Sequence, residues 1–179
     1  MIFDCFTFCN ELELLALRLH ELAPVVDYFV LVEATQTFQG HDKPLYYAKH
    51  KERFRDFHHK IIHVVVEFPD HIVNPYSRKS QAWAREYYQR EQIARGLHKA
   101  AASDLVIISD VDEIISAARL NDALLKRRPN ALTIFTMPAC SFYINRKVRN
   151  MLWTLGPRMI RVKQLHSTQC LRMCKLSAS

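Results

Sequence analysis

The sequence predicts an α/β fold in which a mainly parallel β-sheet is flanked by helices. Short apolar stretches typical of buried strands alternate along the chain with longer stretches whose apolar residues recur at helical spacing. This alternation favours a parallel sheet, because parallel neighbours must be joined by a long crossover. The chain has 179 residues, 49% of them hydrophobic. We therefore expect a single domain over residues 1–179 with one sizeable core.

The first elements are predicted from composition and spacing. Residues 2–8 are aromatic and β-rich, which indicates a buried strand at the start of the domain. A helix is expected next, capped by Asn10 with Glu13 three residues further on, and ending before Pro24. Its apolar face consists of leucines at helical spacing, namely Leu12, Leu15, Leu19 and Leu22. A second strand, apolar on both faces, covers residues 28–32 and ends at Glu33.

The middle of the chain continues the alternation. Polar residues and a glycine predict a loop over 35–44, followed by a short charged helix over 49–57 and a buried strand over 61–66. After a second loop at 68–76, Ser80 opens a long helix that is expected to reach about Ala102. A fourth buried strand covers residues 104–109.

The last third predicts one more helix and several short strands. Residues 116–128 are expected to be helical and to stop before Pro129. The strand candidates that follow are 132–137, 140–144 and 158–162.

Three carboxylates in four residues, Asp110, Asp112 and Glu113, come directly after the fourth strand. Their mutual repulsion is costly unless a cation compensates it, and Mg²⁺ or Mn²⁺ can be held by one or two carboxylates while keeping positions open for phosphate oxygens. Alternation along an extended segment would place Asp110 and Asp112 on one side and Glu113 on the other. The alternative is that Asp112 caps the following helix while its neighbours face solvent.

Two further charged residues belong to the same predicted edge of the sheet. Glu33 ends the second strand, and ligands of open parallel sheets bind at the carboxyl ends of strands. Arg90, on the long helix, is suited to pair with a carboxylate or a phosphate, or with Glu86 one helical turn earlier.

Cysteine count and hydropathy set the expected environment. An odd number of cysteines, in a chain that starts without a secretory signal pattern, predicts free thiols in the cytoplasm. No apolar stretch approaches the roughly 20 residues that span a bilayer, so no transmembrane segment is expected. Cys170 and Cys174 are spaced by one helical turn, but packing is favoured over zinc because no second ligand pair is nearby. The other cysteines are Cys5, Cys9 and Cys140.

Basic residues are concentrated in the last third of the chain. Residues 114–179 contain 12 Lys and Arg and one acidic residue, although the net charge of the whole chain is only +7. Such a segment suits phosphates, nucleic acid or acidic lipid, or is simply a solvated surface. The sequence has no GxSxG, GxxxxGK[ST] or GxGxxG pattern, which argues against a serine hydrolase, a P-loop enzyme and a Rossmann dehydrogenase.

Five blocks in the same order resemble the motifs of glycosyltransferase family 17. They read IFDCFTFCNELELLALRLHEL, VVDYFVLVEA, KPLYY, WAREYYQREQIARGL and DLVIISDVDEI. The resemblance covers most of residues 1–165. It implies a GT-A-like (Rossmann-like) fold and an inverting transfer of N-acetylglucosamine, or a related sugar, from a UDP-sugar to a glycan or other hydroxyl acceptor. The implied cofactor is Mn²⁺ or Mg²⁺, and no nucleic-acid partner is expected.

The resemblance also implies roles for individual residues. Asp110 and Asp112 match the motif that binds metal and diphosphate, and Glu113 is the candidate for the catalytic base. The other matching positions near the expected nucleotide pocket are Asn10, Glu11, Glu33 and Arg90.

Two departures from the family pattern accompany these matches. Related sequences usually have Asn where this chain has Glu91, so an extra carboxylate stands next to Arg90 and affects the expected donor affinity. Family members also continue with a Gly-Trp-His-Phe-Ser-like segment that does not follow Cys174, so we expect a chain incomplete at its C-terminus, with weak turnover.

Two other functions stay open at this stage. One is a different divalent-metal enzyme that processes phosphates. The other is a non-enzymatic, basic nucleic-acid-binding domain that stacks bases on Phe142, Tyr143 and Trp153.

Overall fold

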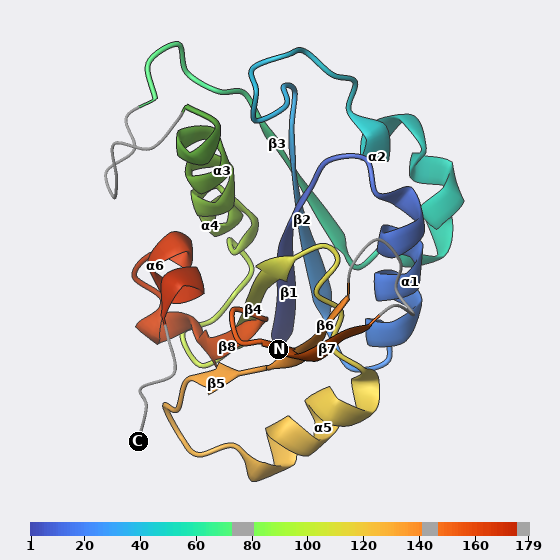
Figure 1. Ribbon diagram of the computed structural model, residues 1–179. Helices are drawn as coiled ribbons and strands as arrows, with labels where there is room; N and C mark the ends of the chain where they lie inside the picture. The colour runs from blue at the N-terminus through green and yellow to red at the C-terminus, as the bar shows by residue number, and fades with distance from the viewer. Residues whose placement is uncertain (73–80, 141–146, 175–179) are drawn as a thin grey trace.

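The computed structural model describes residues 1–72, 81–140 and 147–174 (Figure 1). Its centre is a six-stranded sheet in the order β3-β2-β1-β4-β8-β5. The strands β1 to β4 are parallel to one another, whereas β8 pairs antiparallel with β4 and β5 antiparallel with β8. The prediction of a mainly parallel α/β sheet flanked by helices is therefore confirmed. The strands are β1 (Ile2–Phe8), β2 (Tyr28–Ala34), β3 (Ile61–Val66), β4 (Leu105–Asp110), β5 (Thr133–Ile134) and β8 (Arg158–Arg161).

Helices cover both faces of this sheet, as Figure 1 shows. One face carries α1 (Leu12–Leu22), α2 (Tyr46–Lys49), the 3-10 helix η1 (Lys51–Phe57) and α5 (Ala117–Lys126). The other carries α3 (Gln81–Glu91), α4 (Ile93–Gly96) and α6 (Thr168–Met173). A short 3-10 helix, η2 (Val162–Gln164), follows β8.

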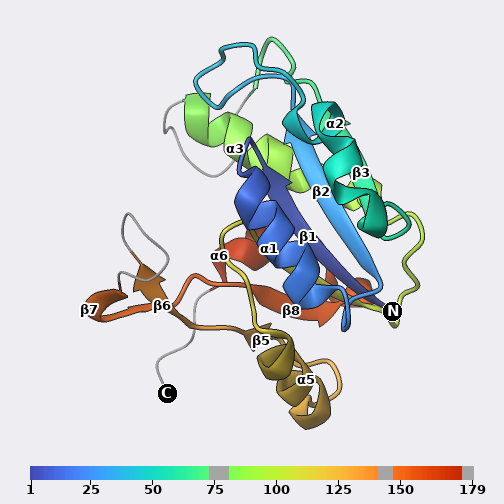
Figure 2. The same cartoon turned by 90° about the vertical axis from the view of Figure 1, so that its right-hand side faces the viewer.

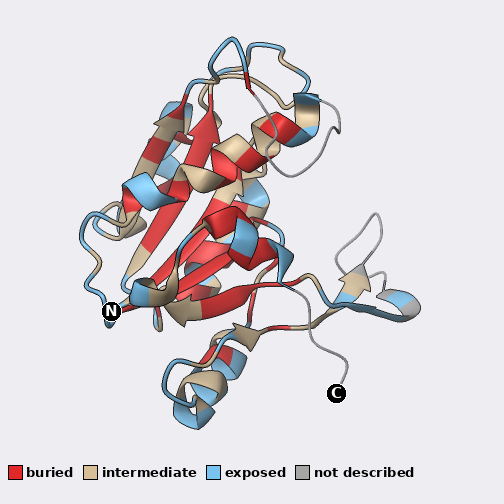
Figure 3. Ribbon diagram, turned by 90° about the vertical axis from the view of Figure 1, so that its left-hand side faces the viewer, coloured by how far each residue is buried: buried red, intermediate tan, exposed pale blue. Residues whose placement is uncertain are grey.

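Alternating side chains of the central strands supply a separate core on each face. Phe6 and Ile107 point to the cluster under α1 and α5, while Cys5 and Ile108 belong to the cluster under α4 and α6. All four side chains are fully buried, and Figure 3 shows the burial concentrated in the sheet. Because β1, β2 and β4 are covered on both sides, most of their residues are apolar.

Helix boundaries are where the expectations from sequence fail most clearly. Asn10 does not cap the first helix: its N-cap is Glu11, and no side chain makes a cap hydrogen bond there. Glu13 instead pairs with Arg53 of η1. The long helix predicted to reach Ala102 is interrupted at Gln92 and ends at Gly96, while its predicted first residue, Ser80, lies outside the described residues.

Gly96 shows why the second segment of this helix lies so close to the sheet. A Cβ atom at this position would stand 2.2 Å from Cγ1 of Val30, so only a glycine allows α4 to pack on β2 at this distance. The neighbouring Ile93 is completely buried against the same face. Close packing on β2 therefore fixes the position of α4, and this short helix ends at Gly96.

The last third differs from the expected strands. A two-stranded antiparallel ribbon is formed by β6 (Met137–Cys140) and β7 (Lys147–Trp153), and it extends away from the main sheet (Figure 2). The strand expected at 140–144 falls mostly outside the described residues, as do Phe142 and Tyr143. None of the helices in the described part of the chain is long and apolar enough to cross a membrane.

The cysteines agree with the expectation only in part. Cys5, Cys9 and Cys174 are free thiols, as predicted. Cys170 and Cys174 were expected to be packed in the core, but both are exposed at α6. Their helix is short and presents Leu171, not the cysteines, to the sheet.

Candidate functional site

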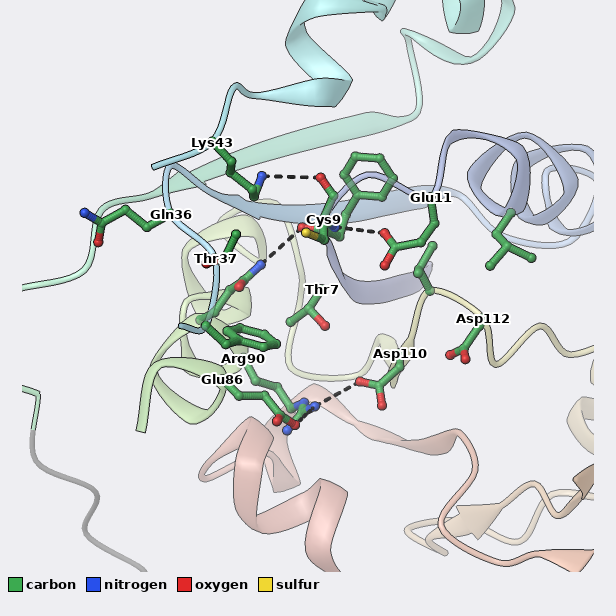
Figure 4. Close-up of a pocket in the computed structure, with 15 residues that line it drawn as sticks. Thr7, Cys9, Glu11, Gln36, Thr37, Lys43, Glu86, Arg90, Asp110 and Asp112 are labelled. Carbon is green, nitrogen blue, oxygen red and sulfur yellow. Dashed lines mark hydrogen bonds and ion pairs between the residues drawn. The ribbon is translucent and has the colours of Figure 1, made fainter. Parts of the chain in front are cut away.

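A cavity of about 360 Å³ opens at the carboxyl ends of the parallel strands (Figure 4). The register of the sheet places Thr7 of β1 beside Asp110 of β4 and Phe8 beside Glu33 of β2, so three strand ends meet here. The walls are formed by Thr7, Phe8, Cys9, Glu11, Leu14, Gln36, Thr37, Phe38, Lys43, Glu86, Gln89, Arg90, Asp110, Val111 and Asp112. The predicted edge of the sheet therefore holds a cavity with acidic and basic side chains on its walls.

Asp110, the last residue of β4, is held between two arginines. Its Oδ1 accepts a hydrogen bond from Arg90 Nη2 at 2.9 Å, and its Oδ2 accepts one from Arg172 Nη2 at 2.9 Å. Burial opposes the charged form of this carboxyl, but the two positive charges outweigh it and lower the pKa of Asp110. Asp110 is thus an ionised, charge-compensated residue whose two oxygens both have partners.

Asp112 has the opposite surroundings. It is exposed at the cavity and forms no ion pair with any residue in the described part of the chain. Partial desolvation, together with the negative charge of Asp110, raises the pKa of the Asp112 carboxyl. The helix that follows is capped by Ser116, so Asp112 is not a helix cap.

Glu113 turns away from the cavity. Its Oε1 accepts hydrogen bonds from Arg172 Nη2 and Trp153 Nε1, both at 2.6 Å, and its Oε2 accepts one from the backbone N–H of Asp110 at 3.1 Å. Burial is the main reason that the pKa of Glu113 is raised. The segment 110–113 is a turn, not an extended strand, since the Glu113 N–H donates to the Asp110 carbonyl. Asp110 and Asp112 nevertheless share the cavity, as alternation had suggested.

Arg18 of α1 fixes the backbone of the turn after β4. This completely buried arginine pairs with Asp4 of β1 at 2.6 and 2.7 Å. Its Nη1 donates to the carbonyl oxygens of Asp110, Val111 and Glu113 at 2.9 to 3.3 Å. We did not predict this pair from the sequence. The available signal was Asp4, the one charged residue in the otherwise mostly apolar strand β1.

The residues predicted after β1 are divided between the cavity and the surface. Glu11 lines the cavity, and its Oε2 accepts hydrogen bonds from the backbone N–H groups of Cys9 and Asn10 at 3.0 and 2.9 Å. Asn10 itself is exposed and is not part of the cavity wall. Lys43 Nζ, from the loop after β2, donates to the carbonyl of the same Cys9 at 3.3 Å.

Glu33 lies behind the cavity wall, not on it. It is completely buried, and its carboxylate accepts a hydrogen bond from the backbone N–H of Tyr47 at 3.2 Å. His63 Nε2 lies 3.1 Å and Lys43 Nζ lies 3.6 Å from its oxygens. Burial and the neighbouring Glu33 charge raise the pKa of Tyr47 to about 12. Glu33 therefore contacts the cavity wall from behind, through its ion pair with Lys43.

Arg90 combines both of its expected pairings. It lines the cavity, and the same Nη2 that donates to Asp110 also donates to Glu86 at 2.9 Å, one helical turn away. Its Nη1 donates to Gln169 of α6 at 2.6 Å. Arg172, which completes this network, was not predicted, because its position within the basic last third gave no sign of a carboxylate partner.

The acidic end of β4 suits a hard divalent cation in one respect. Mg²⁺ and similar ions are held through one or two carboxylates together with substrate phosphates, and Asp112 lines the cavity without an ion-pair partner among the described residues. Both oxygens of Asp110 are already occupied by arginines. Within the described residues, no group of three or more His, Cys, Asp or Glu forms a cage for a metal. Asp112 is therefore the carboxylate on the cavity wall that could hold such an ion.

Comparison with known proteins gives the same assignment as the five sequence blocks. The sequence model of glycosyltransferase family 17 matches residues 1–133. The chain is also similar to the beta-1,4-mannosyl-glycoprotein 4-beta-N-acetylglucosaminyltransferases of Homo sapiens and Rattus norvegicus, with 32% identity over 111 residues. These alignments cover 59% of this chain but 20% of each relative, so the chain spans about a fifth of their length. The family match extends through all four parallel strands and the acidic turn after β4, and the chain therefore belongs to glycosyltransferase family 17.

Proposed function

We propose that this protein transfers N-acetylglucosamine, or a related sugar, from a UDP-sugar to a glycan hydroxyl with inversion and with the help of Mn²⁺ or Mg²⁺. The observation that carries the proposal is the pair of aspartates at a cavity formed by strand ends of a family 17 chain. Asp110 is compensated by two arginines, whereas Asp112 has no ion-pair partner in the described part of the chain. The similarity to beta-1,4-mannosyl-glycoprotein 4-beta-N-acetylglucosaminyltransferases supports the N-acetylglucosamine donor. The GT-A-like arrangement is supported by the mainly parallel sheet and by the acidic DxD sequence at the end of β4.

The residues on the cavity wall suit a nucleoside diphosphate. Asp112 would hold the divalent ion, which, when bound, stabilises negative charge on the departing diphosphate. Lys43 and Arg90 are the positively charged side chains among the residues that line the cavity; Lys43 belongs to the loop after β2 and Arg90 to α3. A ligand with two phosphates can therefore meet a positive side chain from each of these two segments.

Glu113 remains our proposed proton acceptor for the acceptor hydroxyl. Its raised pKa suits a general base, but Glu113 does not line the cavity. It must therefore release Trp153 and Arg172, which both donate to its Oε1, and turn toward the cavity before it can accept the proton. We expect Glu113→Gln to abolish sugar transfer while UDP affinity stays within about twofold. Retained transfer in this variant would exclude Glu113 as the base.

Calorimetric titration of UDP into the purified chain, with Mn²⁺ and then with EDTA, tests the proposal directly. We expect binding in Mn²⁺ that is at least about tenfold tighter than in EDTA, because an ion held by Asp112 would offset the negative charge of the diphosphate. UMP serves as the control ligand, since it lacks the second phosphate. Absence of metal-dependent UDP binding, or hydrolysis of a simple phosphomonoester in its place, would contradict the proposed transferase.

A further inference from the structure

Helix α6 brings a second arginine to the end of β4. Arg172 is only 6% exposed, and its Nη2 donates to Asp110 Oδ2 at 2.9 Å and to Glu113 Oε1 at 2.6 Å. Its Nη1 donates to the carbonyl of Gly156 at 3.1 Å. Arg172 is not one of the residues that line the cavity. Any influence of Arg172 on a bound ligand must therefore pass through the carboxylates that it contacts.

The two arginines occupy Asp110 from opposite sides. Arg90 of α3 holds Oδ1 and Arg172 of α6 holds Oδ2, each at 2.9 Å. A cation that approaches Asp110 must displace a buried guanidinium group, which leaves an uncompensated buried charge. Asp112 has no ion-pair partner among the residues that the structure describes, and Arg18, whose charge acts on it, is itself paired with Asp4. The two aspartates are therefore inequivalent toward a divalent ion.

The position of Arg172 depends on Glu91, the residue that departs from the family pattern. Glu91 does not line the cavity: its carboxylate accepts hydrogen bonds from the backbone N–H groups of Thr168 and Gln169 at 3.3 and 3.0 Å, and from the Ser167 hydroxyl. The Thr168 hydroxyl in turn donates to the carbonyl of Arg90 at 2.7 Å. Glu91 thus anchors the first turn of α6 to the end of α3, and it adds no carboxylate to the donor site.

We propose that Arg172 is a positioning residue: it keeps Asp110 charge-compensated and fixed, so that the divalent ion binds at Asp112. Glu91 supports this role by holding α6 where Arg172 can reach Asp110. This role rests on the proposed function, because the ion and the diphosphate define what is positioned. Removal of the Arg172 charge frees Asp110 Oδ2 to ligate the ion. Binding of the ion then depends less on Asp112.

The test measures how strongly metal binding depends on Asp112 in different backgrounds. UDP is titrated into the 179-residue chain in the presence of Mn²⁺, and Mn²⁺ alone is followed by water-proton relaxation. In the wild-type background we expect Asp112→Asn to weaken Mn²⁺-dependent UDP binding at least about tenfold. In the Arg172→Gln background we expect the same substitution to weaken it by no more than about threefold, since residues that share one network are non-additive.

Matched variants separate this role from a general loss of structure. Arg53→Gln removes an arginine from a surface ion pair with Glu13, and in this background the Asp112 dependence must stay at the wild-type value. Because loss of one partner of a buried pair can prevent folding, Glu91→Gln provides a second route that displaces α6 and keeps Arg172. Its Asp112 dependence should fall between those of the wild type and Arg172→Gln. Circular dichroism checks the fold of each variant.

The outcomes distinguish the two proposals. Equal dependence on Asp112 in the wild-type, Arg172→Gln and Glu91→Gln backgrounds overturns the positioning role and leaves the proposed function intact. Absence of any Mn²⁺-dependent UDP binding by the wild-type chain removes the proposed function and the positioning role with it. A reduced dependence in the folded Arg172 and Glu91 variants supports both.

Discussion

Asp110 and Asp112 carry the same side chain two residues apart, yet their surroundings give them different chemistry. Two arginines lower the pKa of Asp110 against the effect of its burial, while desolvation and the Asp110 charge raise the pKa of Asp112. A carboxylate next to another negative charge gains most from a divalent ion. Asp112 is therefore the more sensitive position for metal binding.

We predict that Asp112→Ala reduces Mn²⁺-dependent UDP affinity at least about tenfold while the melting temperature stays within about 2 °C of the wild type. The side chain is exposed and has no ion-pair partner in the described residues, so its loss leaves no buried group unsatisfied. Calorimetry and thermal unfolding measure the two quantities. Asp122→Ala, an exposed acid on α5, is the matched control. Equal UDP affinity in both variants would contradict the role of Asp112.

Arg18 belongs to the fold, and its loss should be severe. We predict that Arg18→Ala lowers the free energy of unfolding by about 3–5 kcal/mol, because it leaves the buried Asp4 carboxylate without its partner. Arg53→Ala, which removes an exposed pair with Glu13, should cost less than about 1 kcal/mol. Urea unfolding monitored by tryptophan fluorescence measures both. Similar losses in the two variants would contradict the importance of the buried pair.

The lowered pKa of Asp110 predicts a pH dependence of stability. A carboxyl whose pKa is lower in the folded state stabilises the fold above its unfolded pKa of about 3.9, and this contribution is lost as the pH falls through the folded pKa. The free-energy difference between the wild type and Asp110→Asn should therefore be largest above about pH 4 and shrink in more acidic solution. Urea unfolding between about pH 2 and 6 measures it. A difference that does not change with pH would contradict this sign.

At the scale of single elements, packing decides where helices stop. The pattern of residues 81–102 resembles one long helix, but the chain breaks at Gln92 and ends the short α4 at Gly96. Gly96 allows the backbone to approach Val30 at a distance that no side chain permits. Helical periodicity contains no information on this contact, because the contact involves a strand more than sixty residues away in the sequence.

We predict that Gly96→Ala destabilises the protein by about 1–3 kcal/mol, although alanine is the better helix former. The added methyl would lie 2.2 Å from Val30 Cγ1, so strand or helix must shift. Ala94→Ser, on the exposed side of the same helix, should change stability by less than about 0.5 kcal/mol. Denaturant unfolding compares the two. Stabilisation by Gly96→Ala would show that α4 does not require this close approach.

At the scale of the whole molecule, the central strands and the β6–β7 ribbon differ in how firmly they are held. The strands β1, β2 and β4 are buried between two cores, whereas the ribbon extends from the body and exposes Met151 and Leu152 (Figures 2 and 3). Local opening of an element costs less when few buried contacts hold it. The ribbon is therefore able to open while the sheet stays folded.

We predict that amide hydrogens of β1, β2 and β4 exchange only through global unfolding, while those of the described ribbon residues exchange at least about a hundredfold faster. Hydrogen exchange followed by NMR spectroscopy measures both sets of amides. Mild denaturant provides the control, because it should accelerate exchange in the central strands and leave that of the ribbon almost unchanged. Equal protection in the two regions would show that the ribbon unfolds with the sheet.

The sequence by itself determined the fold class and the edge of the sheet where the site lies. The apolar strands 2–8, 28–32 and 104–109 are visible because buried parallel strands must be apolar on both faces. The acidic turn directly after the last of them predicted Asp110 and Asp112 at a common site, and both line the cavity. These inferences needed only local patterns, since a strand brings the residue that follows it to a fixed end of the sheet.

Only the tertiary structure decided which charges meet. Arg172 lies 62 residues after Asp110 and Arg18 lies 92 residues before it, and neither spacing reports a contact. The same holds for Glu91. Because it is next to Arg90 in the sequence, its carboxylate was expected at the donor site, but it binds the first turn of α6. Ion pairs between distant residues depend on how helices pack across the sheet. That packing, and not the residue types alone, makes one aspartate a fixed, compensated anchor and leaves the other open to a cation.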